Sequence, residues 1–278
     1  MKTLAEILSV TADEGQDSYV GQSFAYGVVG VYGGHFLGQS LAAAFETVPA
    51  DKVASSMHAV FLRAGSPDEP IRYRVERLRE GRGFDTRVVT ASQGSAPVFQ
   101  MTASFKIPEA SHDEHQKAMP DAPTPESVRA AREARGGEQP KFPMTVGGGV
   151  DMELISDHFI PAEFAPGREP TLQAWMRVKD EGLLERMSQC ILAYLADGTL
   201  MFNSALPYGV PFRTHRLTSL DQAIWFHRPC DVSGWMFYDQ RSTVVTVGRG
   251  MNERELFDAN GHQILTTAQE SMLRRMDG

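Results

Sequence analysis

The fold is indicated first by one stretch near the N-terminus, Tyr32-Gly33-Gly34-His35-Phe36-Leu37-Gly38-Gln39-Ser40-Leu41-Ala42-Ala43-Ala44-Phe45. Its large apolar residues recur at helical spacing, and small residues fill much of the remaining circumference. Pro49 then ends the predicted helix, because proline cannot continue the backbone hydrogen bonds. A helix that is apolar almost all round has to be enclosed by other elements rather than laid on a single face.

Four alternating or apolar stretches follow this helix and are predicted to be strands: Met57–Leu62, Ile71–Leu78, Phe84–Ser92 and Pro97–Ile107. Short turn signals separate them, namely Arg-Glu-Gly-Arg-Gly at 79–83 and Gln-Gly-Ser at 93–95. One helix followed by strands that short turns connect predicts an α+β fold with an antiparallel sheet.

The second half of the chain repeats this order. A second apolar helix is predicted at Gly182–Ala196, and strands are predicted at Asp221–Phe226, Gly234–Asp239, Ser242–Gly250, Met251–Phe257 and Gln263–Met272. With one constant offset of 165, Phe61-Leu62-Arg63 falls on Phe226-His227-Arg228 and Met101–Ser104 falls on Thr266–Gln269. This shared register favours a duplicated unit, although any two helix-plus-strand units share some likeness.

An antiparallel sheet that curls around a helix encloses it, which is the hot-dog arrangement. We therefore predict an α+β double hot-dog, in which two long apolar helices are each wrapped by an antiparallel sheet. The stretch 109–150 is rich in proline and glycine, with a short polar helix around Glu126–Arg135. The predicted division is an N-terminal hot-dog at 1–110, a linker at 111–147 and a C-terminal hot-dog at 148–278.

Composition excludes several classes of protein. The 278 residues carry a net charge of −8, so the overall charge does not favour binding to nucleic acid. Two cysteines are too few for a disulfide framework and fit a reducing compartment. No apolar run approaches the roughly 18 residues of a membrane span. The expectation is a soluble, cytoplasmic protein with no metal and no cofactor.

Common catalytic motifs do not occur in the sequence. There is no G-x-S-x-G, no phosphate-binding loop and no G-x-G-x-x-G. His112-x-x-His115 lies in the linker without further ligands at metal spacing, and Cys190 sits on an apolar helix face, where a buried thiol is expected. Three polar residues remain: Asp197 after the second helix, Ser219 before a strand, and Gln269 within a strand. Each has an ordinary alternative, respectively a loop acid, a turn residue and a solvent-facing amide.

Four segments together resemble the acyl-CoA thioesterase II (TesB-like) family: Tyr32–Leu41, Phe61–Gly65, Met101–Phe105 and Trp225-Phe226-His227-Arg228-Pro229. The resemblance extends from about Phe24 to Arg274. It implies a double hot-dog fold and hydrolysis of fatty acyl-CoA to free acid and coenzyme A without a cofactor.

The resemblance also implies site residues. The family's Asp, Ser or Thr, and Gln fall on Asp197, Ser219 and Gln269, which would hold and activate a water molecule. Gly33 and Gly34, at the start of the first helix, would allow close approach of the thioester and supply backbone N–H groups to the oxyanion. The catalytic residues would thus lie in the C-terminal hot-dog. The equivalent positions of Arg63 and Arg228 in the two repeats favour a structural role.

Two alternatives to a thioesterase stay open. A hot-dog hydratase or dehydratase would act on the acyl chain, but the Asp followed five residues later by His that such hydratases share does not occur here. A non-catalytic acyl-CoA-binding module would need no Asp, Ser and Gln together. The expected partner is the acyl-CoA substrate, with a homodimer or homotetramer as the assembly.

Overall fold

The protein is described by a computed structural model that covers residues 2–26, 30–137, 142–145, 149–155 and 167–276. The first half contains α1 (Leu4–Leu8), β1 (Thr11–Ala12), β2 (Ser18–Gly21), α2 (Gly33–Phe45), β3 (Val53–Phe61), β4 (Ile71–Arg79), β5 (Phe84–Gln93) and β6 (Ala96–Lys106). The second half contains β7 (Val150–Leu154), β8 (Thr171–Val178), α4 (Glu185–Ala196), η3 (Leu200–Ser204), β9 (His215–Ser219), β10 (Asp221–Phe226), β11 (Met236–Thr246), β12 (Arg249–Asp258) and β13 (Gln263–Arg275). Between the halves lie α3 (Pro125–Ala134) and the 3-10 turn η1 (Pro143–Thr145).

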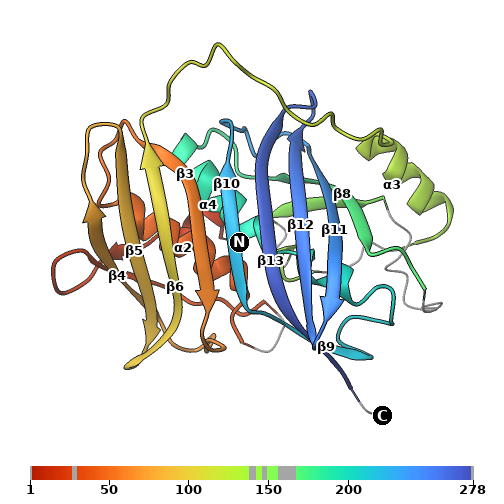
Figure 1. The fold of residues 1–278 in the computed structure, drawn as a ribbon, viewed down its shortest axis with the longest axis horizontal. Coiled ribbons are helices and arrows are strands. Elements are labelled where there is room, and N and C mark those ends of the chain that lie inside the picture. Colours follow the sequence, from red (N-terminus) through yellow and green to blue (C-terminus); the bar gives the residue numbers. More distant parts are fainter. Residues whose placement is uncertain (1, 27–29, 138–141, 146–148, 156–166, 277–278) are drawn as a thin grey trace.

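The strands form one antiparallel sheet in the order β1-β2-β4-β5-β6-β3-β10-β13-β12-β11-β8-β7 (Figure 1). The two halves join where β3 pairs with β10, for example Met57 opposite Ile224. The short strand β9 pairs with β13 beyond the end of β10, so that Ser219 lies opposite Ser271. The predicted double hot-dog is confirmed, with the two sheets merged into one.

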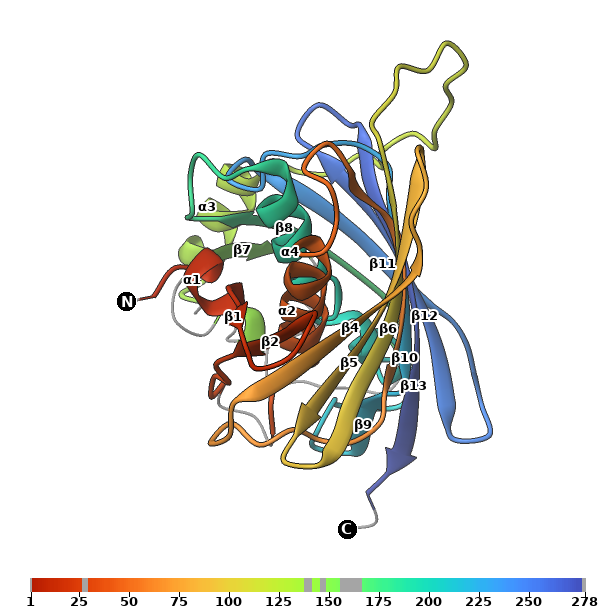
Figure 2. The same ribbon diagram turned by 90° about the vertical axis from the view of Figure 1, so that its left-hand side faces the viewer.

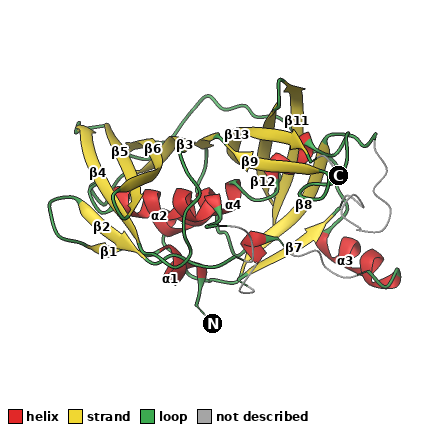
Figure 3. Cartoon of the chain, turned by 90° about the horizontal axis from the view of Figure 1, so that it is seen from below, coloured by secondary structure: helices red, strands yellow, loops and turns green. Residues whose placement is uncertain are grey.

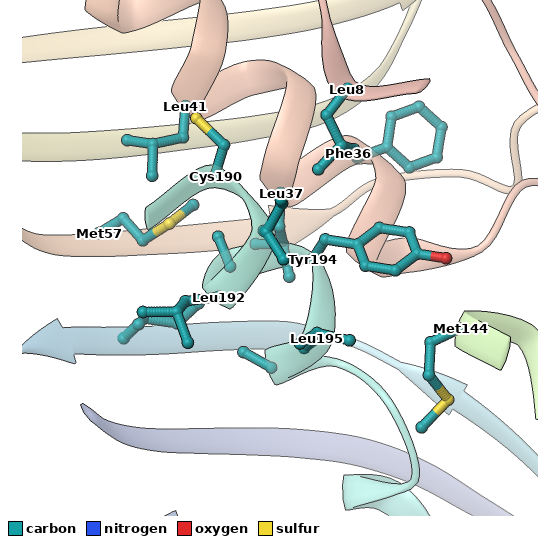
Figure 4. Packing of buried hydrophobic residues seen from close by; sticks show 14 of the residues in the cluster. Leu8, Phe36, Leu37, Leu41, Met57, Met144, Cys190, Leu192, Tyr194 and Leu195 are labelled. Carbon is teal, nitrogen blue, oxygen red and sulfur yellow. The ribbon is translucent and has the colours of Figure 1, made fainter. Parts of the chain in front are cut away.

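Both apolar helices lie on the same face of this sheet, and the sheet curves around them (Figures 2 and 3). Glycines allow α2 and α4 to approach closely. A Cβ at Gly38 would lie 3.0 Å from the carbonyl oxygen of Cys190, and one at Gly34 would lie 2.1 Å from that of Tyr194. Figure 4 shows Cys190 and Tyr194 of α4 in the core with residues of α2. The Cys190 thiol is buried, as predicted.

The internal repeat is visible in the strand positions. The first residues of β4 and β11 and of β5 and β12 are each 165 positions apart, which agrees with the sequence offset. The first residues of α2 and α4, by contrast, are only 152 positions apart. The single offset predicted for the repeat therefore fails at the helices. The second half holds 13 additional residues between its helix and its sheet, in the segment that contains η3 and β9.

Two further differences from the predicted elements have physical causes. Gly234–Asp239 and Ser242–Gly250 were predicted as separate strands, but β11 runs through Gln240 to Thr246, because Gln240 is a buried polar residue rather than a turn residue. The true turn is Val247-Gly248, where both residues have positive φ. The short linker helix is confirmed as α3, whereas residues 138–141 and 146–147 of the predicted linker lie outside the described residues.

Candidate active site

The buried carboxylate of Asp197 is the centre of the site. Asp197 is the C-cap of α4 and is 3% exposed. Its Oδ1 accepts hydrogen bonds from Ser219 Oγ at 3.0 Å and from Gln269 Nε2 at 2.7 Å. Its Oδ2 accepts the backbone N–H of Gly34 at 3.1 Å. The three candidate side chains therefore meet, and the first helix supplies a further donor.

Gln269 is fixed by contacts on both sides of its amide. The side chain is fully buried, so the ordinary alternative of a solvent-facing glutamine is wrong. Its Nε2 also lies 3.2 Å from Ser219 Oγ and 3.1 Å from Gln222 Oε1. Because Nε2 faces these acceptors, the orientation of the amide is defined. Its Oε1 has no hydrogen-bond partner among the described residues and is an available acceptor inside the site.

The electrostatic environment of Asp197 combines opposing effects. Burial raises the pKa of Asp197, because a low-dielectric environment penalises the charged form. The hydrogen bonds from Ser219, Gln269 and Gly34 and the positive charge of Arg254 act in the opposite direction and lower the pKa. The net direction is upward from the ordinary value of the pKa.

Arg254 on β12 holds the backbone around the end of α4. Its Nη1 donates to the carbonyl oxygens of Leu195 at 3.0 Å and Ala196 at 2.9 Å, and its Nη2 donates to that of Gly198. Its Nε donates to Gln240 Oε1 at 3.0 Å. The guanidinium is fully buried, so it satisfies the free carbonyl groups of the helix terminus and positions the buried carboxylate between them.

Sequence reasoning missed Arg254 and Gln222. Arg254 lies between two glutamates, so it resembles one charge of a solvated strand face. The available signal was strand alternation: Asn252, Arg254 and Leu256 share a face, and Leu256 is apolar. Gln222 likewise shares a strand face with the buried Ile224.

Gly33 and Gly34 lie at the site, as the sequence predicted, but their contacts differ from the expectation. The Gly34 N–H binds the Asp197 carboxylate and is thus not free for an oxyanion. A Cβ at Gly33 would lie 2.7 Å from Asp197 Oδ2 and 2.9 Å from the Phe61 ring. Glycine at this position therefore makes room for the carboxylate. The Gly33 N–H, at the first position of α2, has no acceptor within the helix.

The corresponding place in the first half has different residues. With the offset of 152 positions between the helices, Asp197 corresponds to Phe45 and Gly34 corresponds to Arg186. With the offset of 165 positions between the strands, Ser219 corresponds to Ala54 and Gln269 corresponds to Ser104. The guanidinium of Arg186 donates to the carbonyl oxygens of Phe45 and Val48 at 3.2 Å and lies 4.9 Å from the Phe45 ring centroid. This second place is therefore filled by an arginine, and Glu46, the C-cap of α2, is exposed rather than buried as Asp197 is.

The remaining candidates have structural surroundings. Arg63 Nη1 donates to Pro97 O and Arg228 Nη1 to Gln263 O, so each arginine binds the beginning of the neighbouring strand in its own half. His112 and His115 are exposed. No group of three or more His, Cys, Asp or Glu in the described ranges is arranged to hold a metal ion. Among the helices of the described residues, none is long and apolar enough to cross a membrane.

Comparison with known proteins relates the whole chain to one family. Residues 22–106 match the family model "Acyl-CoA thioesterase N-terminal domain", and residues 117–273 match "Acyl-CoA thioesterase C-terminal domain". Acyl-CoA thioesterase 2 of Haemophilus influenzae is 32% identical over 269 residues, which cover 91% of each chain. Human acyl-coenzyme A thioesterase 8 is 30% identical over 93% of this chain and 85% of its own length. The crystal structure of acyl-CoA thioesterase II TesB2 from Mycobacterium marinum has a TM-score of 0.78 and 29% identity, and covers 98% of this chain and 97% of that chain.

Proposed function

This chain belongs to the acyl-CoA thioesterase family, and on that premise we propose that it hydrolyses fatty acyl-CoA to free fatty acid and coenzyme A through a water molecule held by Asp197, Ser219 and Gln269. The observation that carries the assignment of these residues is the convergence of Ser219 Oγ and Gln269 Nε2 on one buried carboxylate oxygen. A thioester carbonyl is electrophilic enough for direct attack by water, so no covalent acyl-enzyme is required.

In the proposed reaction, Asp197 accepts a proton from the water while the water oxygen forms a bond to the carbonyl carbon. Ser219 and Gln269 fix the orientation of the carboxylate and the water, which replaces lost orientational freedom. The free Oε1 of Gln269 is a second acceptor for that water. The tetrahedral intermediate then breaks the C–S bond, and the leaving thiolate takes a proton from Asp197, which restores the carboxylate.

The negative charge on the carbonyl oxygen needs preorganised donors. We assign this role to the N–H of Gly33, because it lies at the positive end of α2 beside Asp197 Oδ2 and has no intrahelical acceptor. Gly34 serves the same site differently, since its N–H holds the carboxylate.

The experiment that tests this proposal is a thiol-release assay across short, medium and long acyl-CoAs, with EDTA present. We expect release of free CoA from at least one fatty acyl-CoA, with no loss of rate on chelation. Loss of activity with EDTA would contradict the proposed mechanism. Hydration of an enoyl-CoA without thiol release would instead identify a hydratase, and binding without turnover would identify a binding module.

Three broader assignments accompany this proposal. Sparse cysteine and the acidic composition support a cytoplasmic enzyme. The open edges of the merged sheet support a homodimer or homotetramer, which light scattering of the purified protein would test. The division into 1–110, 111–147 and 148–278 predicts that limited proteolysis cuts first between residues 111 and 147.

A further inference from the structure

One end of the second half carries an unusual concentration of positive charge. It is formed by the tip of the β11–β12 hairpin, the end of β13, and the segment that leads into β9. Five exposed arginines gather there, Arg213, Arg216, Arg249, Arg274 and Arg275, and we call them the arginine cluster. In a chain with a net charge of −8, such a cluster calls for an explanation.

Backbone contacts place these arginines together. Arg216 and Arg274 are direct cross-strand partners in the β9–β13 pair. Arg249 lies opposite Met272, two residues before Arg274, and the N–H of Met276 donates to Thr214 O, beside Arg213. Both the end of the β11–β12 hairpin and the end of β13 lie at the lower edge of the sheet in Figures 1 and 2.

The charges of the cluster are largely uncompensated. Among the residues that the structure describes, only Arg249 of the five forms an ion pair, with Glu270 at 3.5 Å. Like charges directly opposite each other in a sheet are destabilising, as Arg216 and Arg274 are here. After burial itself, the charge of Arg275 is the factor that lowers the pKa of the neighbouring His215. This end of the molecule therefore attracts anions.

Exposed apolar side chains lie around the same cluster. Five of the exposed large hydrophobic residues belong to these segments: Tyr208, Phe212, Val244, Val247 and Met276. Val247 is 87% exposed at the hairpin tip, and its φ of 50° is unfavourable for a β-branched residue. Asn-Gly is the preferred sequence for a two-residue hairpin turn with positive φ at both residues. Val247 therefore contributes neither burial nor turn stability.

The first half offers an internal comparison. Its equivalent hairpin joins β4 to β5, and under the strand offset Arg82 takes the place of Val247. Arg77 there binds Asp17 and Glu80, whereas Arg79 and Arg82 form no ion pair among the described residues. Leu78 and Phe84 flank that hairpin and are exposed as well, but its tip, Gly81-Arg82-Gly83, carries no apolar side chain. Of these two hairpins, only the one in the second half places an apolar side chain at the tip.

We propose that this end of the second half docks on an anionic lipid surface, with Val247 and the neighbouring apolar side chains inserted at the headgroup boundary and the arginine cluster bound to lipid phosphates. Exposed apolar residues flanked by cations are the chemistry of interfacial membrane binding. A second copy in an isologous contact would bring arginine against arginine, so charge disfavours that occupant.

The phosphates of coenzyme A fit less well than lipid phosphates. Arg216 is exposed, whereas the alternating residues Leu217 and Ser219 face the helix side, where Asp197 lies. The guanidinium of Arg216 is therefore on the opposite face of the sheet from the proposed catalytic carboxylate. Docking would bring the protein to the membrane, into which fatty acids and acyl-CoA partition. The docking itself can be tested without substrate.

The test is co-sedimentation of the full chain with phosphatidylcholine vesicles with and without phosphatidylglycerol. We expect binding only to the anionic vesicles, weakened by salt. Each arginine near such a surface contributes about fivefold in affinity, so the double variant R274Q/R275Q should bind about 25-fold more weakly. V247N should lose up to about tenfold while its thermal midpoint stays at or above that of the wild type.

The matched control is R79Q/R82Q, which removes the same charge from the equivalent hairpin of the first half and should bind as the wild type does. Equal binding to neutral and anionic vesicles, or an equal loss in R79Q/R82Q, would overturn the proposal. A raised KM of R274Q/R275Q for a short acyl-CoA without vesicles would assign the cluster to coenzyme A instead. A change of oligomeric state in the same variant would assign it to a second copy.

Discussion

The two halves of this molecule share one architecture and differ in chemistry. At the end of α4, Asp197 accepts three hydrogen bonds in a buried place that glycines of α2 leave open. At the end of α2, Phe45 stands in the position of the acid, and Arg186 occupies the place where Gly34 stands in the other half. The difference teaches that the fold does not depend on the acid, because at the end of α2 an arginine binds the carbonyl groups and no buried carboxylate is present.

Both halves contain a fully buried arginine that binds carbonyl groups at the end of the apolar helix. Arg254 on β12 binds the carbonyl groups around the end of α4. Arg87 on β5 binds the carbonyl oxygen of Thr47 at 2.9 Å, just beyond the end of α2. The two arginines do not occupy equivalent positions under the strand offset, since Arg87 corresponds to Asn252. The shared requirement is therefore to satisfy the helix terminus, and only in the second half does it also position an acid.

The largest expected effect comes from removing the acid that distinguishes the halves. Asp197→Asn should lower kcat by about 10²- to 10⁴-fold, since a catalytic base contributes that much. Glu46→Gln, at the exposed C-cap of the first helix, should leave kcat unchanged. Steady-state thiol release, with circular dichroism to show that both variants are folded, measures this. Near-normal turnover of Asp197→Asn would reduce Asp197 to an ordinary loop acid.

The hydroxyl of Ser219 is a second difference between the two halves, because Ala54 stands at the matching position of the first half. Ser219→Ala removes a hydrogen bond to a charged group, so kcat should fall about tenfold to a hundredfold. Ser219→Thr keeps the donor and should retain most activity. In the first half, Ala54→Ser restores a hydroxyl at the matching position and should add no activity, because no acid lies beside it. An inactive threonine variant would show that shape, not the hydroxyl, is required.

The buried arginines predict a difference in pH dependence. Asp197 is active as the carboxylate, so kcat/KM should fall as the pH falls through its raised pKa. Arg254 lowers that pKa, so Arg254→Gln should move the acid limb to higher pH, whereas Arg254→Lys keeps the charge and should leave the limb in place. Arg87→Gln should lower the thermal midpoint without moving the limb. A limb that moves in both glutamine variants would mean that unfolding, not the charge beside Asp197, controls the profile.

The last prediction concerns the number of active sites per chain. If only the second half is competent, titration with a tight non-hydrolysable acyl-CoA analogue should give one catalytic equivalent per chain rather than two. Asp197→Asn combined with Gln269→Ala should then retain no enzymatic turnover. Two equal and independent sites would break the comparison on which the other predictions rest.

Much of the fold was accessible from the sequence because strand alternation and apolar helices are local patterns. Apolar and alternating stretches predicted β11 to β13 well, apart from the misplaced turn near Gln240. The 13 additional residues between α4 and the strands of the second half escaped notice, because their strand β9 has no counterpart among the predicted strands. β7 and β8 were also missed, since β8 alternates only weakly between buried and exposed positions.

The site was accessible only in part, for a different reason. Asp197, Ser219 and Gln269 came from a family resemblance, and their individual settings favoured ordinary roles. Arg254, Gln222 and the bond from Gly34 to Asp197 depend on contacts between segments far apart in the chain. Such contacts leave no local pattern, except for the alternation that places Arg254 on the apolar face of its strand.

The pairing of β3 with β10 has a consequence for how the protein is made. At about 5–20 residues per second, β10 leaves the ribosome roughly 10–30 s after β3. During that interval the N-terminal unit presents an open strand edge, and the bond between Gly34 and Asp197, 163 positions apart, cannot yet form. The edge of β3 that is not yet paired is made less prone to aggregation by its polar residues Ser55, Ser56 and His58. The nascent chain is thus protected where it is incomplete, and the hydrogen bond from Gln269 to Asp197 forms only when the last strand is in place.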